Sequence, residues 1–335
     1  MTAVSRIVLA RRPVGMPVAD DFREEAAELP PIADGEVLVA VRTLSIDPAI
    51  RGFLDDRPSY LPPVAIGETV RGMMLGEVLA SRNPALVIGQ HVRALAGWAD
   101  RVVLSADALG LEVVETDPDI AIETRMGALG PAGLTAWVGL HVIAAVRPGE
   151  TVLVSAAAGA VGSVACQIAR LRGCRVIGLA GSAAKCAAIR DLGVETAIDY
   201  RAESDLAAAI AAAAPGGVDV YFDNVGGATL ETILPLMRDQ GRVAVCGMIG
   251  DYNDQDHPYG VRTLWQLVVR RLTLRGFLTY DHGDRLAEAQ RDLDAWASAG
   301  ALRSLETIYH GIGAAPQAFI DLMARRTIGK TLVRL

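Results

Sequence analysis

Cysteine is scarce in this chain and is placed so that it supports no metal site. Four cysteines occur in 335 residues, and no two of them form a CxxC pair, so the sequence supports neither a zinc knuckle nor a redox couple. We expect four buried thiols, at Cys166, Cys174, Cys186 and Cys246. The first 125 residues contain no cysteine and a single histidine, His91, which excludes the Cys, His and acid set of a catalytic zinc site.

Clusters of basic residues and long apolar runs are also missing. The net charge is −7 and the pI is near 5.3, so we predict no nucleic-acid partner, because phosphate binding requires clustered Lys and Arg. No apolar run approaches the roughly 20 residues that span a bilayer, which argues against a membrane role. The opening MTAVSRIVLARRPVG lacks the apolar core and cleavage site of a signal peptide. We therefore expect a cytoplasmic protein.

The chain is long enough for two domains, and its texture changes near residue 130. Residues 1 to about 125 carry short β-branched runs between Pro and Gly, such as GEVLVAVRTLSID, and indicate a mostly β domain. Beyond them, buried strands alternate with helices of about ten residues, which predicts βαβ units and a parallel, doubly wound sheet. The expected strands are 151–156, 174–180, 196–200, 218–225, 241–247 and 272–278.

The end of the chain returns to the β-rich texture of its beginning. After a helix near 285–300 come a strand-like segment at 304–312, a helix at 315–326 and a strand at 329–335. The predicted fold class is therefore α/β, with a Rossmann domain at 126–301 and a mostly β domain at 1–125 that is completed by 302–335. We expect a cleft between the two domains.

The loop AAGAVG, between a predicted strand and a predicted helix, indicates dinucleotide binding. Gly159 and Gly162 would let backbone amides approach a pyrophosphate at the positive end of the helix. The pattern is G-x-G-x-x-G with Ala157 in first position. Such a loop alone can be an ordinary tight turn, but the strand before it, the helix after it and the further strands favour the nucleotide site.

The next strand ends without the acidic residue that grips the ribose hydroxyls in NAD enzymes. The stretch GLAGSAAKC offers Gly181, Ser182 and Lys185 instead, which leaves room for a 2′-phosphate and supplies a cation. Lys185 alone could be a surface lysine. The missing acid points the same way, so we predict NADPH rather than NADH.

Several motifs together resemble one family over essentially the whole chain. They are GETVLVSAAAGAVGSVACQIARLRGCRVIGLAGSAAKC, DVYFDNVGG, VAVCGMIGDYN, LRGFLTYD, LSIDPAIRG and the closing IGKTL. They resemble the zinc-independent medium-chain reductases of the leukotriene 12-hydroxydehydrogenase and prostaglandin reductase group, which includes bacterial NADPH-dependent curcumin reductases. The resemblance implies a GroES-like β domain beside the Rossmann domain, commonly a homodimer, and reduction of the carbon–carbon double bond of α,β-unsaturated ketones and aldehydes.

The resemblance also implies which residues bind the cofactor. The pyrophosphate would lie on the loop 159–162. The 2′-phosphate would be bound by Lys185 and Tyr200, beside Ser182. Phe277, Leu278 and Thr279 would present backbone groups to the nicotinamide carboxamide. The full implied set is Gly159, Ala160, Val161, Gly162, Ser182, Lys185, Tyr200, Asn224, Cys246, Gly247, Met248, Ile249, Phe277, Leu278, Thr279 and Thr327.

Departures from the family pattern lie near the implied sites. Thr327 stands where the family usually has Asn, which removes one cofactor hydrogen bond. Ala49 and Ile50 replace a tyrosine and a methionine that often face the substrate, and Pro131 stands in a stretch, GPAGLTAW, that is altered as well. These changes indicate a reshaped or wider substrate pocket.

Reduction of an enone requires a hydrogen-bond donor at the carbonyl oxygen, where negative charge builds. Tyr252 in GDYND is the candidate; the alternative is a loop tyrosine that only packs. Asp47 and Arg51 are interpreted as an ion pair that fixes a loop. Tyr60 and Trp98 would line an apolar pocket or pack a loop, and Tyr259 would belong to a loop over the substrate.

Two other functions stay open on the sequence alone. A quinone reductase of the same superfamily is one, and an NADPH-binding protein with little turnover is the other. The retained Tyr252 favours an enzyme over a binding protein, and the loop VCGMIGDYN favours enones over quinones. The partner is then a small enone or alkenal, and no metal takes part.

Overall fold

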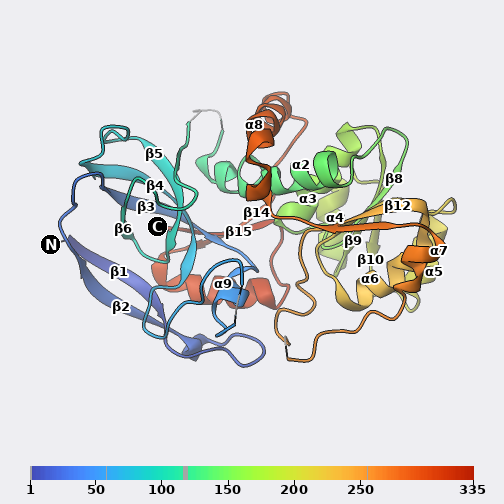
Figure 1. Ribbon diagram of the computed structural model, residues 1–335, viewed down its shortest axis with the longest axis horizontal. Helices are drawn as coiled ribbons and strands as arrows, with labels where there is room; N and C mark the ends of the chain where they lie inside the picture. Colours follow the sequence, from blue (N-terminus) through green and yellow to red (C-terminus); the bar gives the residue numbers. More distant parts are fainter. Residues whose placement is uncertain (1, 58, 116–119, 255) are drawn as a thin grey trace. The chain divides into compact units, whose positions relative to one another are not determined.

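The computed structural model describes residues 2–57, 59–115, 120–254 and 256–335, and the chain folds into two compact units (Figure 1). Unit 1 comprises Met1–Met126, Thr307–Thr327 and Thr331–Leu335. Unit 2 comprises Gly127–Glu306 and Ile328–Lys330. The chain therefore passes from unit 1 to unit 2 after Met126 and returns to unit 1 at Thr307. A three-residue segment near the C-terminus, Ile328–Lys330, also belongs to unit 2.

Unit 1 is built on antiparallel sheets, as its β-branched runs predict. Its larger sheet has the order β14-β15-β3-β4-β5-β7, with β6 paired to β3, and β1 and β2 form a second, two-stranded sheet. The strands are β1 Thr2–Leu9, β2 Phe22–Leu29, β3 Val37–Ile46, β4 Arg71–Ser81, β5 His91–Gly97, β6 Arg101–Leu104, β7 Glu112–Val113, β14 Glu306–His310 and β15 Lys330–Arg334. The helices are short: α1 Ile50–Phe53 and α9 Ala315–Met323.

An aromatic cluster forms part of the core of unit 1. The Trp98 ring is fully buried, 5.7 Å from Phe22 and 5.9 Å from Phe319 between ring centroids. Phe319 lies on α9, and the edge-to-face contact that it makes with Phe22 is typical of buried aromatic pairs. Helix α9, far along the chain, is thereby held on the N-terminal sheets.

Unit 2 contains a six-stranded, all-parallel sheet with the order β10-β9-β8-β11-β12-β13. Numbered within the unit this is 3-2-1-4-5-6, the doubly wound order of dinucleotide-binding domains. The α/β fold class is confirmed. The strands are β8 Thr151–Val154, β9 Arg175–Ala180, β10 Thr196–Asp199, β11 Val218–Asp223, β12 Met237–Val245 and β13 Thr273–Gly276.

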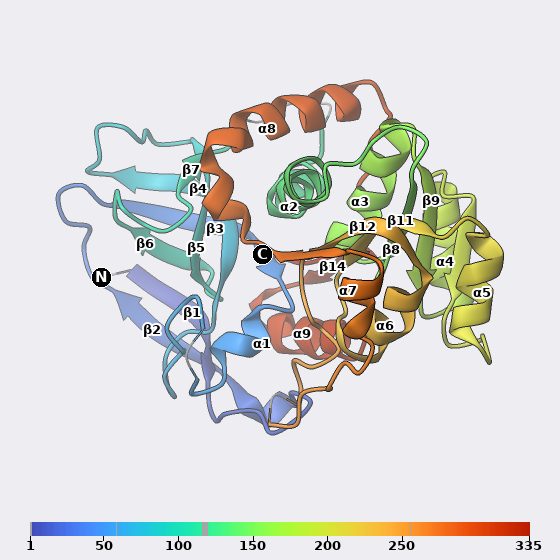
Figure 2. The same ribbon diagram turned by 45° about the vertical axis from the view of Figure 1, so that its right-hand side comes forward.

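Helices cover both faces of this sheet (Figure 2). The helices of unit 2 are α2 Pro131–Val138, α3 Ala160–Leu171, α4 Ala183–Asp191, α5 Leu206–Ala213, α6 Gly227–Ile233, α7 Trp265–Val269 and α8 Gly283–Ser298. On one face, Ile210 of α5 and Ile233 of α6 pack with Leu153 and Tyr221 of the strands. Helix α2 packs against α3 and α8. No helix in the described part of the chain is long and apolar enough to cross a membrane.

Local departures from the predicted elements have identifiable causes. Strand β12 begins at Met237 rather than Gly241, and Gln240 interrupts it with a positive φ of 62°, which no periodicity reveals. Helix α2 continues into a turn of π-helix at Gly139–Ile143. Helix α7 was not predicted, because its exposed apolar sequence WQLVV shows no amphipathic pattern.

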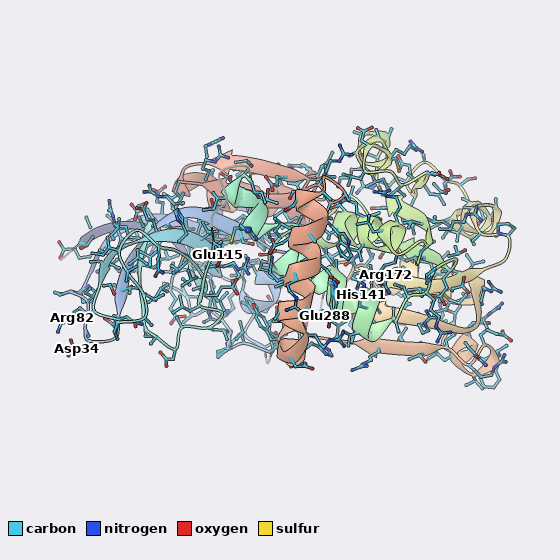
Figure 3. The ribbon with its side chains drawn as sticks, turned by 90° about the horizontal axis from the view of Figure 1, so that it is seen from above. Asp34, Arg82, Glu115, His141, Arg172 and Glu288 are labelled. Atoms are coloured by element: carbon cyan, nitrogen blue, oxygen red, sulfur yellow. The ribbon has the colours of Figure 1, made fainter. Side chains whose placement is uncertain are left out.

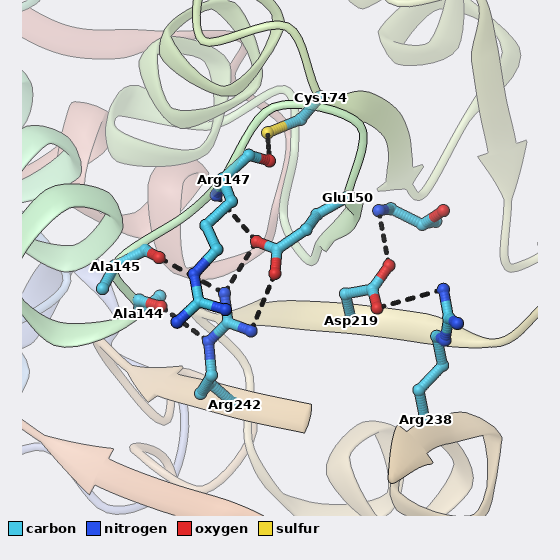
Figure 4. A network of polar contacts seen from close by, with 9 residues as sticks. Ala144, Ala145, Arg147, Glu150, Cys174, Asp219, Arg238 and Arg242 are labelled. Atoms are coloured by element: carbon cyan, nitrogen blue, oxygen red, sulfur yellow. Dashed lines mark hydrogen bonds and ion pairs between the residues drawn. The ribbon is translucent and has the colours of Figure 1, made fainter. Parts of the chain in front are cut away.

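Polar contacts close the end of the parallel sheet at which β8 and β11 begin (Figure 4). Arg242 binds Glu150 through two nitrogens, at 2.9 and 2.7 Å, and donates to the Ala144 carbonyl at 2.7 Å. Asp219 accepts the Thr151 amide at 2.8 Å and pairs with Arg238. The loops that follow β8 and β11 lie at the opposite, carboxyl end of these strands.

Candidate dinucleotide site

The strand order of unit 2 places a crevice at the carboxyl ends of β8 and β11. These two strands are neighbours, but the chain continues from β8 toward β9 and from β11 toward β12, on opposite sides. The loops that follow them diverge, and ligands of doubly wound sheets bind where this happens. The loops after Val154 and after Asp223 are thus the candidate cofactor site.

The loop after β8 brings the predicted glycines to the start of α3. Gly159 is the residue that precedes the helix, with extended backbone, and Ala160 is its first residue. A Cβ on Gly162 would lie 2.3 Å from the Ala156 carbonyl oxygen, so only glycine lets the helix come this close to the loop. The backbone amides at the helix start are then available to a pyrophosphate.

Ser182 and Tyr200 follow the ends of β9 and β10, and Lys185 lies in the first turn of α4. The Ser182 hydroxyl caps α4 by accepting the Lys185 amide at 3.3 Å. A Cβ on Gly181 would lie 2.7 Å from the Tyr200 hydroxyl, so the phenol lies over Gly181. The loop 181–185 carries no acidic side chain that would repel a 2′-phosphate.

The loops after β11 and β12 are joined by backbone hydrogen bonds. Cys246 and Gly247 donate their amides to the Asp223 carbonyl at 2.8 and 3.2 Å, and Ile249 donates to the Asn224 carbonyl at 3.3 Å. Burial raises the pKa of the Cys246 thiol to about 12, so this cysteine is a neutral side chain rather than a nucleophile. Three of the thiols are buried as expected, and Cys246 is half-buried.

Tyr252 points its phenol back at this joined loop. Its oxygen accepts the Met248 amide at 3.3 Å and would lie 3.3 Å from a Cβ on Gly247. Burial raises the pKa of Tyr252, although the Met248 amide opposes the shift in part. The hydroxyl therefore keeps its proton at neutral pH, and it donates to no acceptor among the described residues. It is a neutral donor available to a ligand.

The remaining predicted residues of unit 2 lie around α2 and α6. Thr279 shares a hydrogen bond of 2.8 Å with Thr135 on α2, the helix that Pro131 opens. The Phe277 ring lies against Gly139, and Leu278 is exposed. The Tyr259 hydroxyl donates to Glu231 of α6 at 3.2 Å.

Ala49, Ile50, Tyr60, Trp98 and Thr327 belong to unit 1. Ala49 precedes α1, Ile50 is buried within it, and Thr327 is buried as well. Tyr60 is 55% exposed and packs edge-to-face on Phe53, so its ring is accessible to a ligand. The Trp98 ring is fully buried and packs in the core, so it is not accessible to a ligand. Of the two roles predicted for Trp98, packing is the one that the structure shows.

The predicted pairing of Arg51 with Asp47 is wrong in its partner. Arg51 pairs with Asp55 at 2.6 Å, one helical turn along, and its guanidinium also donates to the Gly15 carbonyl at 3.2 Å. Asp47 accepts a hydrogen bond from the Ser45 hydroxyl. An ion pair holds this loop as predicted, but the pair is Arg51–Asp55, at i and i+4.

Sequence reasoning missed two residues that shape the cofactor loop. Ser155, directly after β8, bonds to the loop after β11. Gly329, from the chain's last motif, donates its amide to the Ala158 carbonyl at 2.7 Å, and a Cβ there would lie 1.9 Å from the Leu305 carbonyl oxygen. The glycine in IGKTL was a visible signal, but its partner is more than a hundred residues away.

Metal ligands do not gather anywhere in the described ranges. No group of three or more His, Cys, Asp or Glu side chains there could hold a metal ion. The loops already described offer backbone amides, Lys185 and the Tyr252 phenol.

Comparison with known proteins agrees with this geometry. Residues 5–112 match the family model described as the N-terminal domain of oxidoreductase, and residues 160–295 match the model described as zinc-binding dehydrogenase. The chain is 38% identical to the NADPH-dependent curcumin reductase of Escherichia coli, over 98% of this chain and 96% of that protein. It is 37% identical to prostaglandin reductase 1 of Bos taurus, over 96% of each.

Solved structures give the same result. The crystal structure of CurA from Vibrio vulnificus in complex with NADPH has a TM-score of 0.92 and 36% identity, and each chain is covered to 98%. Family models, relatives and structure agree over nearly the whole length. The chain therefore belongs to the curcumin reductase and prostaglandin reductase group of the medium-chain dehydrogenase/reductase family.

Proposed function

We propose that this protein reduces the carbon–carbon double bond of α,β-unsaturated ketones and aldehydes with NADPH. The observation that carries the proposal is the neutral Tyr252 phenol, a donor held beside the loops of a dinucleotide site. The names of its relatives, curcumin reductase and prostaglandin reductase, support the same chemistry. The proposal requires no metal, because a phenol can donate a hydrogen bond to the carbonyl oxygen of the substrate.

The residues of unit 2 fit NADPH as the cofactor. Gly159, Ala160, Val161 and Gly162 would surround the pyrophosphate at the start of α3; the Gly159 amide donates to the Ala156 carbonyl at 2.8 Å, so the amides of the other three would hold it. The 2′-phosphate would be held by Lys185 and Tyr200 with Ser182. The nicotinamide half would meet Asn224, the loop Cys246 to Ile249, and Phe277, Leu278 and Thr279. When bound, NADPH supplies the hydride.

Tyr252 would stabilise the charge that builds on the substrate. As the β-carbon becomes saturated, negative charge moves to the carbonyl oxygen, and a donor already in place lowers the barrier. The Met248 amide fixes the phenol oxygen, so the O–H bond is left to point at the ligand. The α-carbon then takes its proton from water or from the same phenol.

The residues proposed to bind the substrate are those that the family resemblance implies. They are Ala49, Ile50 and Tyr60, which belong to unit 1, and Pro131 and Tyr259, which belong to unit 2. Ala49 and Pro131 have small or rigid side chains where the family has larger ones. A bulky apolar enone would therefore be accepted together with short alkenals.

We also propose a homodimer formed through unit 2. Strand β13 ends the parallel sheet, and all four of its residues are exposed. The segment around it carries apolar side chains in water, and Trp265 is 68% exposed. We call this segment the β13 edge; its exposed apolar residues are Leu264, Trp265, Val268, Val269, Leu274, Leu278 and Tyr280. An open edge with such residues favours pairing with a second copy.

The decisive experiment is NADPH oxidation at 340 nm with a panel of enones, alkenals and quinones. The panel includes a bulky diarylheptanoid and a short alkenal, and the products are identified by mass. Saturated ketone or aldehyde is the expected result. Turnover of quinones alone would assign the quinone reductase alternative, and cofactor binding without any turnover would assign a binding protein.

A further inference from the structure

A buried polar network joins the ends of β8 and β11 beneath the proposed cofactor site. Its centre is Asp223, whose side chain is 0% exposed. One carboxylate oxygen, Oδ1, receives the Tyr221 hydroxyl at 2.6 Å, the Val225 and Gly226 amides at 2.9 Å each, and the Ser155 hydroxyl at 3.3 Å. Four donors on one oxygen fix the turn that follows β11.

Ser155 extends this network to Asn224. The Ser155 hydroxyl accepts the Asn224 backbone amide at 2.9 Å, and the Ser155 carbonyl accepts the Asn224 side-chain Nδ2 at 2.7 Å. Because the carboxamide is planar, a fixed Nδ2 also fixes Oδ1, which lies on the opposite side. Oδ1 takes no hydrogen bond from any described residue, so it is an oriented acceptor without a protein donor.

This network lowers the stability of the fold, so we look for a role that depends on its geometry. The second oxygen of Asp223, Oδ2, is buried and has no partner among the residues that the structure describes, and burial raises the pKa of this carboxyl group. A buried polar atom left unsatisfied lowers stability, and an apolar residue of the same shape would avoid the penalty. Such an arrangement is expected where side chains must hold a ligand-binding group in one geometry.

We propose that Ser155 and Asp223 are positioning residues that hold the Asn224 carboxamide with Oδ1 turned toward the nicotinamide half of the cofactor. The inference rests on the proposed function, in which Asn224 contacts the cofactor. It assigns Ser155 and Asp223 a role that neither plays by touching the cofactor. The Ser155 hydroxyl holds the Asn224 backbone amide, which places Nδ2 on the Ser155 carbonyl, and Asp223 sets the turn from which Asn224 projects.

A double-mutant cycle on NADPH affinity tests the inference. The dissociation constant is measured by cofactor fluorescence for the wild type, Ser155→Ala, Asn224→Ala and the double variant. Ser155→Ala keeps the carbonyl that accepts Nδ2 and removes the hydroxyl that holds the Asn224 amide and Asp223 Oδ1. If that hydroxyl acts through Asn224, Ser155→Ala weakens binding about 10-fold in the wild type and changes nothing in the Asn224→Ala background. The same loss in both backgrounds, or wild-type affinity in Asn224→Ala, overturns the proposal.

Matched variants separate positioning from folding. Ser163→Ala removes another buried serine hydroxyl of unit 2, whose one hydrogen bond to a described residue goes to the Ala160 carbonyl at 3.4 Å, and is expected to bind NADPH normally. Asp223→Asn keeps an Oδ1 acceptor for the turn, so it should retain more affinity than Asp223→Ala at equal thermal stability. If the two bind equally, Asp223 has no positioning role.

The test does not depend on enone reduction. Cofactor affinity is measured without substrate, so absence of turnover overturns the proposed function and leaves the cycle intact. In the active enzyme, Ser155→Ala should raise the KM for NADPH and leave the KM for the enone unchanged. A rise in both would indicate general distortion and contradict the inference.

Discussion

The hydroxyl group of Tyr252 is the single donor on which the proposed chemistry depends. Replacing Tyr252 by Phe removes that donor and keeps the ring. Loss of one oxyanion donor typically lowers kcat by about 10²-fold or more. We expect such a loss with little change in NADPH affinity, measured by steady-state kinetics and cofactor fluorescence.

The control for this change is another tyrosine. Tyr309→Phe removes a phenol that bonds Asp321 in unit 1, and its turnover should match the wild type. The pKa of Tyr252 lies above its ordinary value of 10, so the wild-type rate should also show no loss of this donor between about pH 6 and 9. Unchanged turnover in Tyr252→Phe would remove the residue from the mechanism.

Lys185 tests the choice between the two nicotinamide cofactors. Lys185→Ala should weaken NADPH about 10- to 100-fold, because a charge-assisted hydrogen bond to the 2′-phosphate is lost, and should leave NADH nearly unchanged. Dissociation constants for both cofactors decide the matter. Arg190→Ala, on the same helix α4, is the matched loss of a cation. Equal losses for NADPH and NADH would contradict the assignment.

His141 makes the stability of unit 2 depend on pH. Its ring stacks on Trp137, with 4.4 Å between centroids, and Nε2 is buried with no hydrogen-bond partner in the described part of the chain. Burial lowers the pKa of His141, and Arg172 adds to the shift; the Trp137 carbonyl, Asp292 and Glu288 oppose it (Figure 3). The unfolded chain therefore binds a proton near pH 6.5, where the folded chain does not.

The sign of this effect follows from the lowered pKa. Stability is complete above the unfolded value and is lost as the pH falls from about 6.5 toward the folded pKa. We expect the urea midpoint of the wild type to fall between pH 7.5 and 5.5, and to fall less in His141→Phe, which keeps the ring stack. An equal fall in both proteins would assign the pH dependence to other groups.

Among the elements, the start of the parallel sheet depends on Arg242 of β12. This side chain links β12 to Glu150 before β8 and to the carbonyls after α2 (Figure 4). Arg242→Met would leave a half-buried Glu150 and two carbonyl oxygens without their donor. We expect a loss of about 2 kcal/mol in the free energy of unfolding, measured by denaturant titration.

An exposed pair on a nearby strand end provides the comparison. Arg271 and Asp239 form an ion pair in which both side chains are more than half exposed. Arg271→Met should therefore change the stability by no more than about 0.5 kcal/mol. If both variants lose the same amount, burial of the Arg242 contacts is not what stabilises this end of the sheet.

For the whole molecule, the β13 edge predicts the state of assembly. Two copies of the 35.3 kDa chain would give a dimer by sedimentation or light scattering. Trp265→Glu or Leu274→Glu should yield the monomer, because a charge would be buried against the partner. Val87→Glu, at an exposed apolar position of unit 1, should stay dimeric. A monomeric wild type would contradict the assignment.

Much of the architecture was predictable because it depends on local pattern. Strands and helices of unit 2 alternate in the sequence, and the run TVLVSA followed by AAGAVG identifies the first strand and the phosphate loop. The missing acid after the second strand indicated NADPH. Each of these signals lies within about twenty residues, where hydrophobic period and turn residues determine the backbone.

The tertiary structure decided what depends on contacts between distant residues. In the folded chain, Trp98 packs in the aromatic core and Arg51 pairs with Asp55. Gly329 bonds to the phosphate loop, and Ser155 bonds to Asp223. The sequence by itself determined the fold class and the kind of cofactor, because those follow from local periodicity and one loop. Side-chain partners follow from packing across the sheet, which no local pattern records.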